Sequence, residues 1–292
     1  MPENIISVFQ SSPWLFYSTI LFTGLCVGSF LNVVAYRLPL MMERDWKVEC
    51  HEFLQLEPVS MDDRLAKLNL ATPASACPNC GHRLRPWENI PVLSYLFLKA
   101  RCSSCKTHIS AQYPVVEALT GIVSLIVAQR FGVSLQTLAA LLFSWTLIAL
   151  TLIDIKKQLL PDNITLPLLW AGICLSFFEI FTDLQASVIG AIAGYMILWS
   201  VYQLFKLVTK KEGMGFGDFK LLAALGAWIG YSYIPQIILL SAVVGSVIGI
   251  SMLAVGRTKS QQTIPFGPYL AIAGWVAMLW GDTITEKYLS FL

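Results

Sequence analysis

The sequence predicts an all-α membrane protein that crosses the bilayer several times. Hydrophobic residues make up 56% of the chain and charged residues only 13%, whereas soluble domains carry about 25% charged residues. The mean hydropathy is +0.65. Apolar runs also recur along the chain at lengths near the ~20 residues that a helix needs to cross a bilayer. We therefore expect the lipid bilayer as a partner, and no nucleic acid.

About eight transmembrane helices are expected. The first apolar run, Pro13–Tyr36, is followed by the polar block Arg37–Gln112. Seven further runs follow that block: Tyr113–Gln129, Leu135–Ile153, Ile164–Phe181, Ala186–Phe205, Phe219–Gly230, Ile234–Val255 and Phe266–Trp280. The run Phe219–Gly230 is the shortest of the eight. We predict three parts: a first transmembrane helix (1–36), a polar domain (37–112) and a membrane-embedded core (113–292).

The basic residues indicate the orientation. With eight spans, four polar segments lie on one side of the membrane and hold 18 of the 20 Lys and Arg residues. The positive-inside rule therefore predicts that these segments are cytoplasmic and that both termini lie outside. The segments are Arg37–Gln112, Asp154–Asn163, Lys206–Lys220 and Gly256–Pro265. The first twelve residues hold no Lys or Arg, so we expect a retained helix rather than a cleaved signal peptide.

Four of the seven cysteines in the chain form two CxxC pairs in the polar block, Cys77 with Cys80 and Cys102 with Cys105. Each CxxC turn directs two sulfur atoms at one ion, and 21 residues between the pairs match a four-thiolate zinc site. Two disulfides or free thiols are the alternative, but disulfides are disfavoured in a reducing cytoplasm. The sequence therefore predicts a structural zinc ion in the polar domain, inserted between the first and second transmembrane helices.

Two aspartates stand at the ends of apolar runs. Asp154 follows the run ending at Ile153, and Asp218 closes the glycine-rich segment Gly213–Asp218. A carboxylate at a membrane boundary is costly and is a functional-site hypothesis by default. By topology both lie at the cytoplasmic face, where one ionised and one protonated carboxyl could hydrolyse an amide.

Other interpretations of the acids stay open from the residues alone. Asp218 could be an N-cap, and Asp154 could be an interfacial partner of a neighbouring lysine. Asp162 looks like a turn and cap residue before the fourth span. Glu117 is an intramembrane candidate, but an interfacial acid with a hydrogen-bond partner on its own helix explains it more simply.

Seven motifs in one order give the chain a close resemblance to the type IV prepilin peptidases. GxGD at Gly215–Asp218 alone would be moderate evidence, whereas the ordered set is specific and covers nearly the whole chain. The motifs are Gly28–Pro39, the double CxxC, Arg85–Pro91, Ser110–Glu117, Asp154 with Leu160–Asp162, Gly215–Lys220 and Ile264–Pro268.

The resemblance implies a bifunctional enzyme of the bacterial inner membrane. Members cleave a short basic leader after a glycine from type IV prepilins and from the pseudopilins of type II secretion. They then methylate the new N-terminal residue, usually phenylalanine, with S-adenosylmethionine. The resemblance assigns the catalytic roles to Asp154 and Asp218. It assigns no individual methyl-transfer residue, and no nucleotide-binding glycine fingerprint follows a predicted strand.

Two other classes of function remain compatible with the residues. In a transporter or channel, Asp154, Asp218 and Glu117 would form an ion relay. In an assembly scaffold, the zinc module would be a docking surface. The cytoplasmic segments are basic, so a basic leader would have to meet local acids, for which the candidates are Glu43, Glu49, Asp62 and Asp63.

Overall fold

The computed structural model describes residues 2–58, 61–254 and 265–290. All the regular secondary structure of the described residues is helical, apart from two isolated β-bridges. This confirms the predicted all-α fold class. Val255 and the predicted cytoplasmic segment from Gly256 to Ile264 lie outside the described residues. The chain forms two compact units, Met1–Val133 and Ser134–Leu292.

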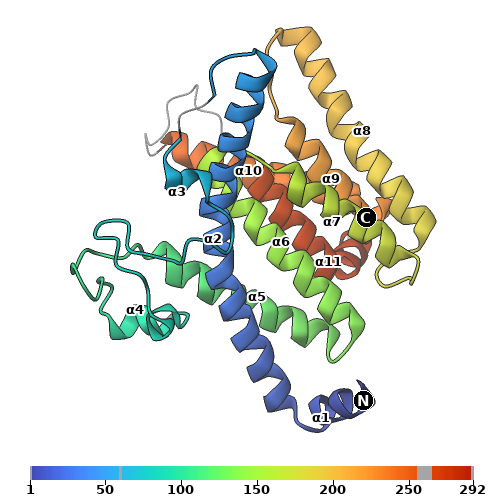
Figure 1. Ribbon diagram of the computed structural model, residues 1–292. Coiled ribbons are helices and arrows are strands. Elements are labelled where there is room, and N and C mark those ends of the chain that lie inside the picture. Colours follow the sequence, from blue (N-terminus) through green and yellow to red (C-terminus); the bar gives the residue numbers. More distant parts are fainter. Residues whose placement is uncertain (1, 59–60, 255–264, 291–292) are drawn as a thin grey trace. The chain divides into compact units, whose positions relative to one another are not determined.

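Unit 1 is built on two long helices, α2 (Pro13–Phe53) and α5 (Gln112–Phe131), which cross each other (Figure 1). The other helices of this unit are shorter: α1 (Pro2–Ser11), α3 (Asp63–Ala66), the 3-10 turn η1 (Pro86–Asn89) and α4 (Leu93–Phe97). The 41 residues of α2 span about 60 Å at 1.5 Å per residue. This helix therefore continues well beyond the predicted end of the first span at Tyr36.

Small residues allow α2 and α5 to approach closely. A Cβ added to Gly28 would lie 2.8 Å from Cα of Glu117, and one added to Gly24 would lie 2.6 Å from Oγ of Ser124. Gly121 packs in the same way against leucine side chains of α2. Such contacts are typical of helix pairs in membranes, where close packing replaces the hydrophobic driving force.

Two arginines on the polar half of α2 hold the chain that follows it. Arg37 donates to the backbone carbonyls of Asn69 (3.0 Å) and Pro73 (2.8 Å). Arg44 donates to three carbonyls of residues 65–68, at 3.0–3.3 Å. Backbone carbonyls that are shielded from water need other hydrogen-bond partners. The two arginines supply them and so fix residues 65–73 along the side of α2.

Unit 2 surrounds one short, buried helix. Its helices are α6 (Leu135–Lys157), α7 (Asp162–Ser176), α8 (Leu184–Thr209), α9 (Phe216–Ile229), the 3-10 turn η2 (Tyr231–Tyr233), α10 (Ile234–Ala254) and α11 (Gly267–Ser290). The helix α9 lies between α7, α8 and α11 (Figure 1). Eleven of its 14 residues are buried, as expected of a helix that is apolar on all sides.

Each of the eight predicted spans coincides with a helix. Five helices in the described part of the chain are long and apolar enough to cross a membrane: α2, α5, α6, α8 and the stretch Tyr231–Met252 that contains α10. With 15 and 14 residues, α7 and α9 fall short of the ~20 that a full crossing needs. The polytopic membrane fold is confirmed, and the number eight stays a prediction.

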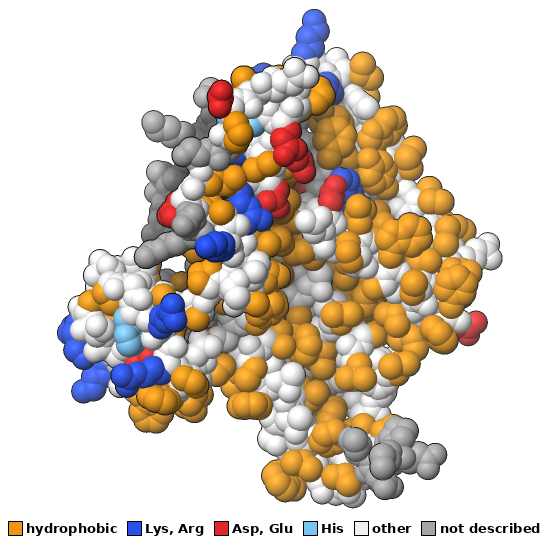
Figure 2. All heavy atoms as spheres, viewed as in Figure 1, with side chains coloured by type: hydrophobic (Ala, Val, Ile, Leu, Met, Phe, Trp, Pro, Cys, Tyr) orange, Lys and Arg blue, Asp and Glu red, His pale blue; other side chains and the backbone are white. Residues whose placement is uncertain are grey.

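Apolar side chains cover the outer face of unit 2. Figure 2 shows hydrophobic side chains over most of the visible surface of α8. The α8 side chains of Ile192, Val201 and Leu204 are 55–65% exposed. A large exposed apolar surface marks an interaction with a membrane or a partner, and with the span-length helices it indicates contact with lipid.

Candidate active site and candidate metal centre

The two CxxC pairs lie on two turns of the same design. In the first, the backbone N–H of Cys77 donates to His82 and that of Gly81 donates back to Cys77. In the second, Cys102 and Lys106 make the equivalent bonds. The fifth residue of each turn has a positive φ, +70° at Gly81 and +60° at Lys106, and this left-handed residue lets the chain reverse just after the second cysteine.

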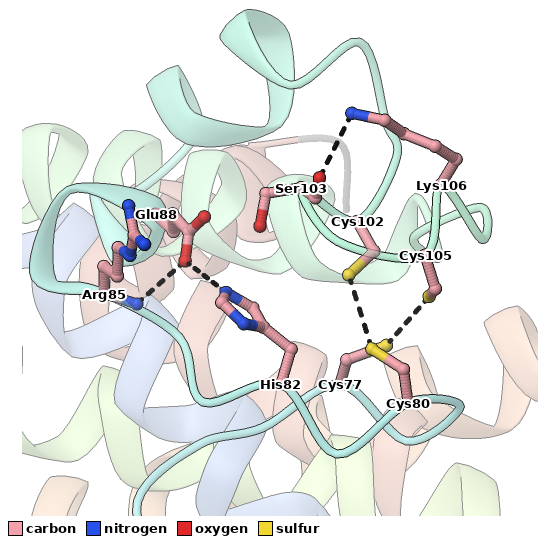
Figure 3. A network of polar contacts seen from close by, with 9 residues as sticks. All are labelled: Cys77, Cys80, His82, Arg85, Glu88, Cys102, Ser103, Cys105 and Lys106. Carbon is pink, nitrogen blue, oxygen red and sulfur yellow. Dashed lines mark hydrogen bonds and ion pairs between the residues drawn. The ribbon is translucent and has the colours of Figure 1, made fainter.

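These turns bring the four predicted ligands, Cys77, Cys80, Cys102 and Cys105, together (Figure 3). Their sulfur atoms all lie within 4.8 Å of one another. The Sγ atoms of Cys77 and Cys105 are 3.8 Å apart, and those of Cys80 and Cys102 are 4.0 Å apart. A disulfide needs about 2.05 Å, whereas Zn–S bonds of ~2.3 Å give a tetrahedron with edges of about 3.8 Å. The cluster therefore has the dimensions of a metal site and not of two disulfides.

The thiols of this cluster have unequal pKa values. The Thr107 hydroxyl and backbone amide, together with Asn79, lower the pKa of Cys105 to about 5. The backbone amide of His82 acts in the same direction on Cys80, but burial and the three neighbouring thiols outweigh it and raise the pKa of Cys80 to about 11. Neighbouring thiolates repel one another, and a cation at the centre would remove this conflict.

The neighbours of the cluster hold its first turn in place. The side chain of Glu88 accepts a bond from the backbone N–H of Arg85 at 2.9 Å and lies 3.2 Å from Nε2 of His82 (Figure 3). The Arg85 amide, followed by Ser103 and His82, lowers the pKa of Glu88 to about 2. His82 thus contacts a carboxylate beside the cluster, as expected for a residue that supports the site without being a ligand.

The two predicted catalytic aspartates lie together in unit 2. Asp154 is in the last turn of α6 and Asp218 is in the first turn of α9, and their exposed fractions are only 5% and 7%. Although 64 residues separate them in the sequence, they are close enough to interact electrostatically. The N-cap of α9 is Gly215, so the interpretation of Asp218 as an N-cap is wrong.

A further glycine and a leucine complete the surroundings of this pair. The backbone of Gly267, the first residue of α11, lies beside the Asp154 carboxyl. Oδ2 of Asp154 is buried and has no hydrogen-bond partner among the described residues. Leu160 lies against both Gly217 and Gly267. The sequence motifs contain Gly217, Leu160 and Gly267, but no spacing in the sequence indicates that the three meet.

The rival acids have partners of their own. Both carboxylate oxygens of Asp162 are 2.7 Å from Nζ of Lys220, which makes Asp162 half of an exposed ion pair. Glu117 belongs to unit 1, where it accepts the backbone N–H of Val92 at 2.7 Å. Val92 has a φ of +60°, a rare conformation for a β-branched residue. Glu117 therefore has a structural partner that the sequence did not reveal.

Unit 1 also contains a cavity of about 250 Å³. It lies between α2, residues 70–75 and η1. Its lining combines Arg37, Ser29, Ser75, Asn89 and Phe30 with apolar residues. A mixture of apolar walls and a few polar groups is typical of small-molecule sites.

Comparisons with known proteins agree with the division of the chain into units 1 and 2. Residues 22–131 match the bacterial peptidase A24 N-terminal domain, and residues 141–250 match the type IV leader peptidase family. No solved structure matches the chain.

Curated relatives match over almost the full length. A prepilin leader peptidase/N-methyltransferase of Pseudomonas aeruginosa is 54% identical over 98% of both chains. One of Aeromonas salmonicida is 50% identical over the same share, and one of Burkholderia pseudomallei is 48% identical over 88% of this chain and 83% of its own. With these relatives and both matching domains, the chain belongs to the type IV leader peptidase family.

Proposed function

We propose that this protein removes the basic leader peptide of type IV prepilins and type II secretion pseudopilins after a glycine and then N-methylates the new N-terminal residue, usually phenylalanine. The observation that carries the peptidase half is the buried pair of carboxyls, Asp154 and Asp218, on the ends of two different helices. The relatives named prepilin leader peptidase/N-methyltransferase support both halves.

Asp154 and Asp218 supply the two groups that amide hydrolysis requires. The ionised carboxyl takes a proton from a water molecule, whose oxygen attacks the carbonyl carbon of the scissile bond. The protonated carboxyl donates its proton to the carbonyl oxygen. When the tetrahedral intermediate collapses, the C–N bond breaks and the leaving nitrogen takes the proton that the first carboxyl accepted from water. A hydroxyl of the intermediate returns a proton to the second carboxyl. Two adjacent carboxyls suit this division because both cannot readily be ionised at once.

We infer that the ion held by the four cysteines is zinc in a structural role. Four thiolates fill a tetrahedral site completely, which is the pattern of structural zinc and leaves no open position for a substrate. Cys77, Cys80, Cys102 and Cys105 would hold the ion. Its chemical contribution is to cross-link two short loops that have little apolar core of their own.

For the methyl transfer we propose S-adenosylmethionine as the donor and the unit 1 cavity as its site. Arg37, which also donates to the carbonyls of Asn69 and Pro73, supplies a positive charge for the carboxylate of such a ligand. Asn89 and the two serines suit its polar groups, and Phe30 is an aromatic neighbour for its adenine ring. When bound, the donor supplies an electrophilic methyl group. The chain itself binds and orients the donor.

The basic segments support a location in the bacterial inner membrane with the active site at the cytoplasmic face and both termini in the periplasm. A prepilin presents a basic leader in the cytoplasm and an apolar helix in the membrane. Its scissile bond then lies at the interface, which is the depth expected for Asp154 and Asp218. Among the acids that could receive the leader, the side chain of Asp63 lies outside the described residues.

Mass spectrometry of a prepilin incubated with the purified protein tests both halves in one measurement. Without S-adenosylmethionine we expect a product shortened by the leader, and with it the same product heavier by one methyl group. The Asn89→Ala variant should lose methylation at limiting donor concentration and keep cleavage. An intact prepilin after incubation with folded, metal-loaded protein would refute the peptidase half.

A further inference from the structure

Gly267 leaves no room for a side chain beside Asp154. A Cβ built on Gly267 would lie 2.5 Å from Oδ2 of Asp154 and 3.2 Å from its Cγ. Real Cβ atoms essentially never approach another heavy atom so closely. The carboxyl of Asp154 can therefore keep its position only while residue 267 is glycine.

The same residue places the start of a helix at the carboxyl. Asp154 lies in the last turn of its own helix, α6, where the helix dipole disfavours a negative charge. Gly267 is the first residue of α11, and a helix N-terminus presents unpaired N–H groups and a partial positive charge. The start of α11 beside the carboxyl thus offsets the unfavourable charge of the C-terminal end of α6.

The surroundings prevent Gly267 from moving away. Pro268 follows it, and the residue before a proline has restricted backbone angles. On another side, Cδ1 of Leu160 lies 3.2 Å from the same built Cβ. Leu160 is itself buried and packs against Gly217, where a built Cβ would lie 2.7 Å from Cβ of Leu160. Gly217 directly precedes Asp218, so the contacts connect both carboxyls.

We propose that Gly267 is a positioning residue of the peptidase reaction: its missing side chain, at the start of α11, fixes the position of the Asp154 carboxyl relative to Asp218. This inference rests on the proposed peptidase function. A misplacement of about 1 Å in a catalytic group costs on the order of 100-fold in rate. Since Gly267 acts on a carboxyl and not on the leader, its substitution should lower kcat and leave KM nearly unchanged.

The first test compares Gly267→Ala with Gly274→Ala in the purified, full-length protein. Gly274 lies on the same helix, and a Cβ there would meet Cδ2 of Leu225 at 2.5 Å, so the control adds the same methyl group at the same packing distance without touching a carboxyl. We expect kcat for prepilin cleavage to fall about 10- to 100-fold in Gly267→Ala, with KM within twofold of wild type. Equal kcat values for the two variants would overturn the proposal.

The second test needs no activity and covers a poorly folding variant. Removing the Asp154 side chain beyond Cβ should make room for the methyl group, so Gly267→Ala should lower Tm much less in an Asp154→Ala background than in wild type. Equal losses of Tm in the two backgrounds would contradict a contact between Gly267 and Asp154. A wild-type protein that cleaves no prepilin would instead refute the proposed function. The Tm comparison of the two backgrounds would still test the contact between Gly267 and Asp154.

Discussion

Asp154 and Asp218 reach the same place from opposite ends of two helices. Asp218 has the favourable position, the first turn of α9, whereas Asp154 is in the last turn of α6 and depends on α11 for compensation. The two carboxyls are therefore chemically unequal before any substrate binds. Unequal environments are the usual means by which paired carboxyls divide acid and base roles.

Asp154→Asn and Asp218→Asn should each abolish prepilin cleavage. An amide keeps the size of the side chain but can neither accept nor donate the required proton, so we expect kcat to fall at least about 10³-fold. Asp162→Asn is the matched control because Asp162 is exposed and paired with Lys220, and it should retain cleavage. Full activity in either of the first two variants would rule out the pair.

Glu117→Gln should retain cleavage. Glutamine keeps an oxygen that can accept the Val92 N–H, which Glu117 accepts at 2.7 Å. Glu117→Leu removes this acceptor and should destabilise the protein by about 1–3 kcal/mol, the cost of an unpaired buried group. Cleavage rates and thermal unfolding of the two variants distinguish these roles. A loss of cleavage in folded Glu117→Gln would make Glu117 a catalytic candidate again.

At the scale of elements, the sequence predicts the positions of the helices well and their contacts poorly. Each of the eight apolar runs found by hydropathy lies in a helix, because the hydropathy of a long apolar run does not depend on its tertiary contacts. It does not reveal that α9 is enclosed by protein on all sides, since an apolar run looks the same whether lipid or helices surround it. The meeting of Gly217, Leu160 and Gly267 depends on three separate helix ends, and no local pattern encodes it.

The enclosure of α9 depends on glycines at its contacts with α8. A Cβ on Gly194 would lie 2.6 Å from the backbone oxygen of Leu222, and backbone cannot turn aside as a side chain can. Gly194→Ala should therefore destabilise the protein by about 1–3 kcal/mol. In Gly245→Ala the new Cβ would meet only the ring of Tyr269 at 3.1 Å, and a smaller loss of Tm is expected. Equal losses would contradict this account of the α8–α9 contact.

For the whole molecule, the cysteine cluster and the aspartate pair lie in different compact units. The CxxC spacing was sufficient to predict the cluster, since both turns are local. The unit 1 cavity was not predictable, because it depends on the arginine bonds that hold residues 65–73 beside α2.

Loss of the metal should act first on unit 1. Cys77→Ser removes one of four sulfur ligands, and we expect the zinc content, measured by elemental analysis of the purified protein, to fall well below one ion per chain. Cys174→Ser, a cysteine outside the cluster, should leave zinc content unchanged. Unchanged zinc in Cys77→Ser would count against the site.

The two activities should also separate. We expect methylation of a pre-cleaved pilin to survive in Asp154→Asn, since the proposed donor site lies in unit 1. Mass spectrometry of the pre-cleaved substrate measures this directly. Loss of methylation in that folded variant would indicate a single shared centre instead.

The length of α2 has a mechanical consequence. Its apolar half packs on α5, and its polar half carries Arg37 and Arg44, which bind backbone carbonyls of residues 65–73. One continuous helix therefore connects α5 with residues 65–73. Each residue added to a helix turns everything beyond it by about 100°. A single insertion between Gly28 and Arg37 would therefore rotate both arginines away from the carbonyls they bind, while the contacts of Gly24 and Gly28 with α5 would stay intact. The number of residues in α2 between its contacts with α5 and its two arginines therefore determines the orientation of the polar segment relative to this helix pair.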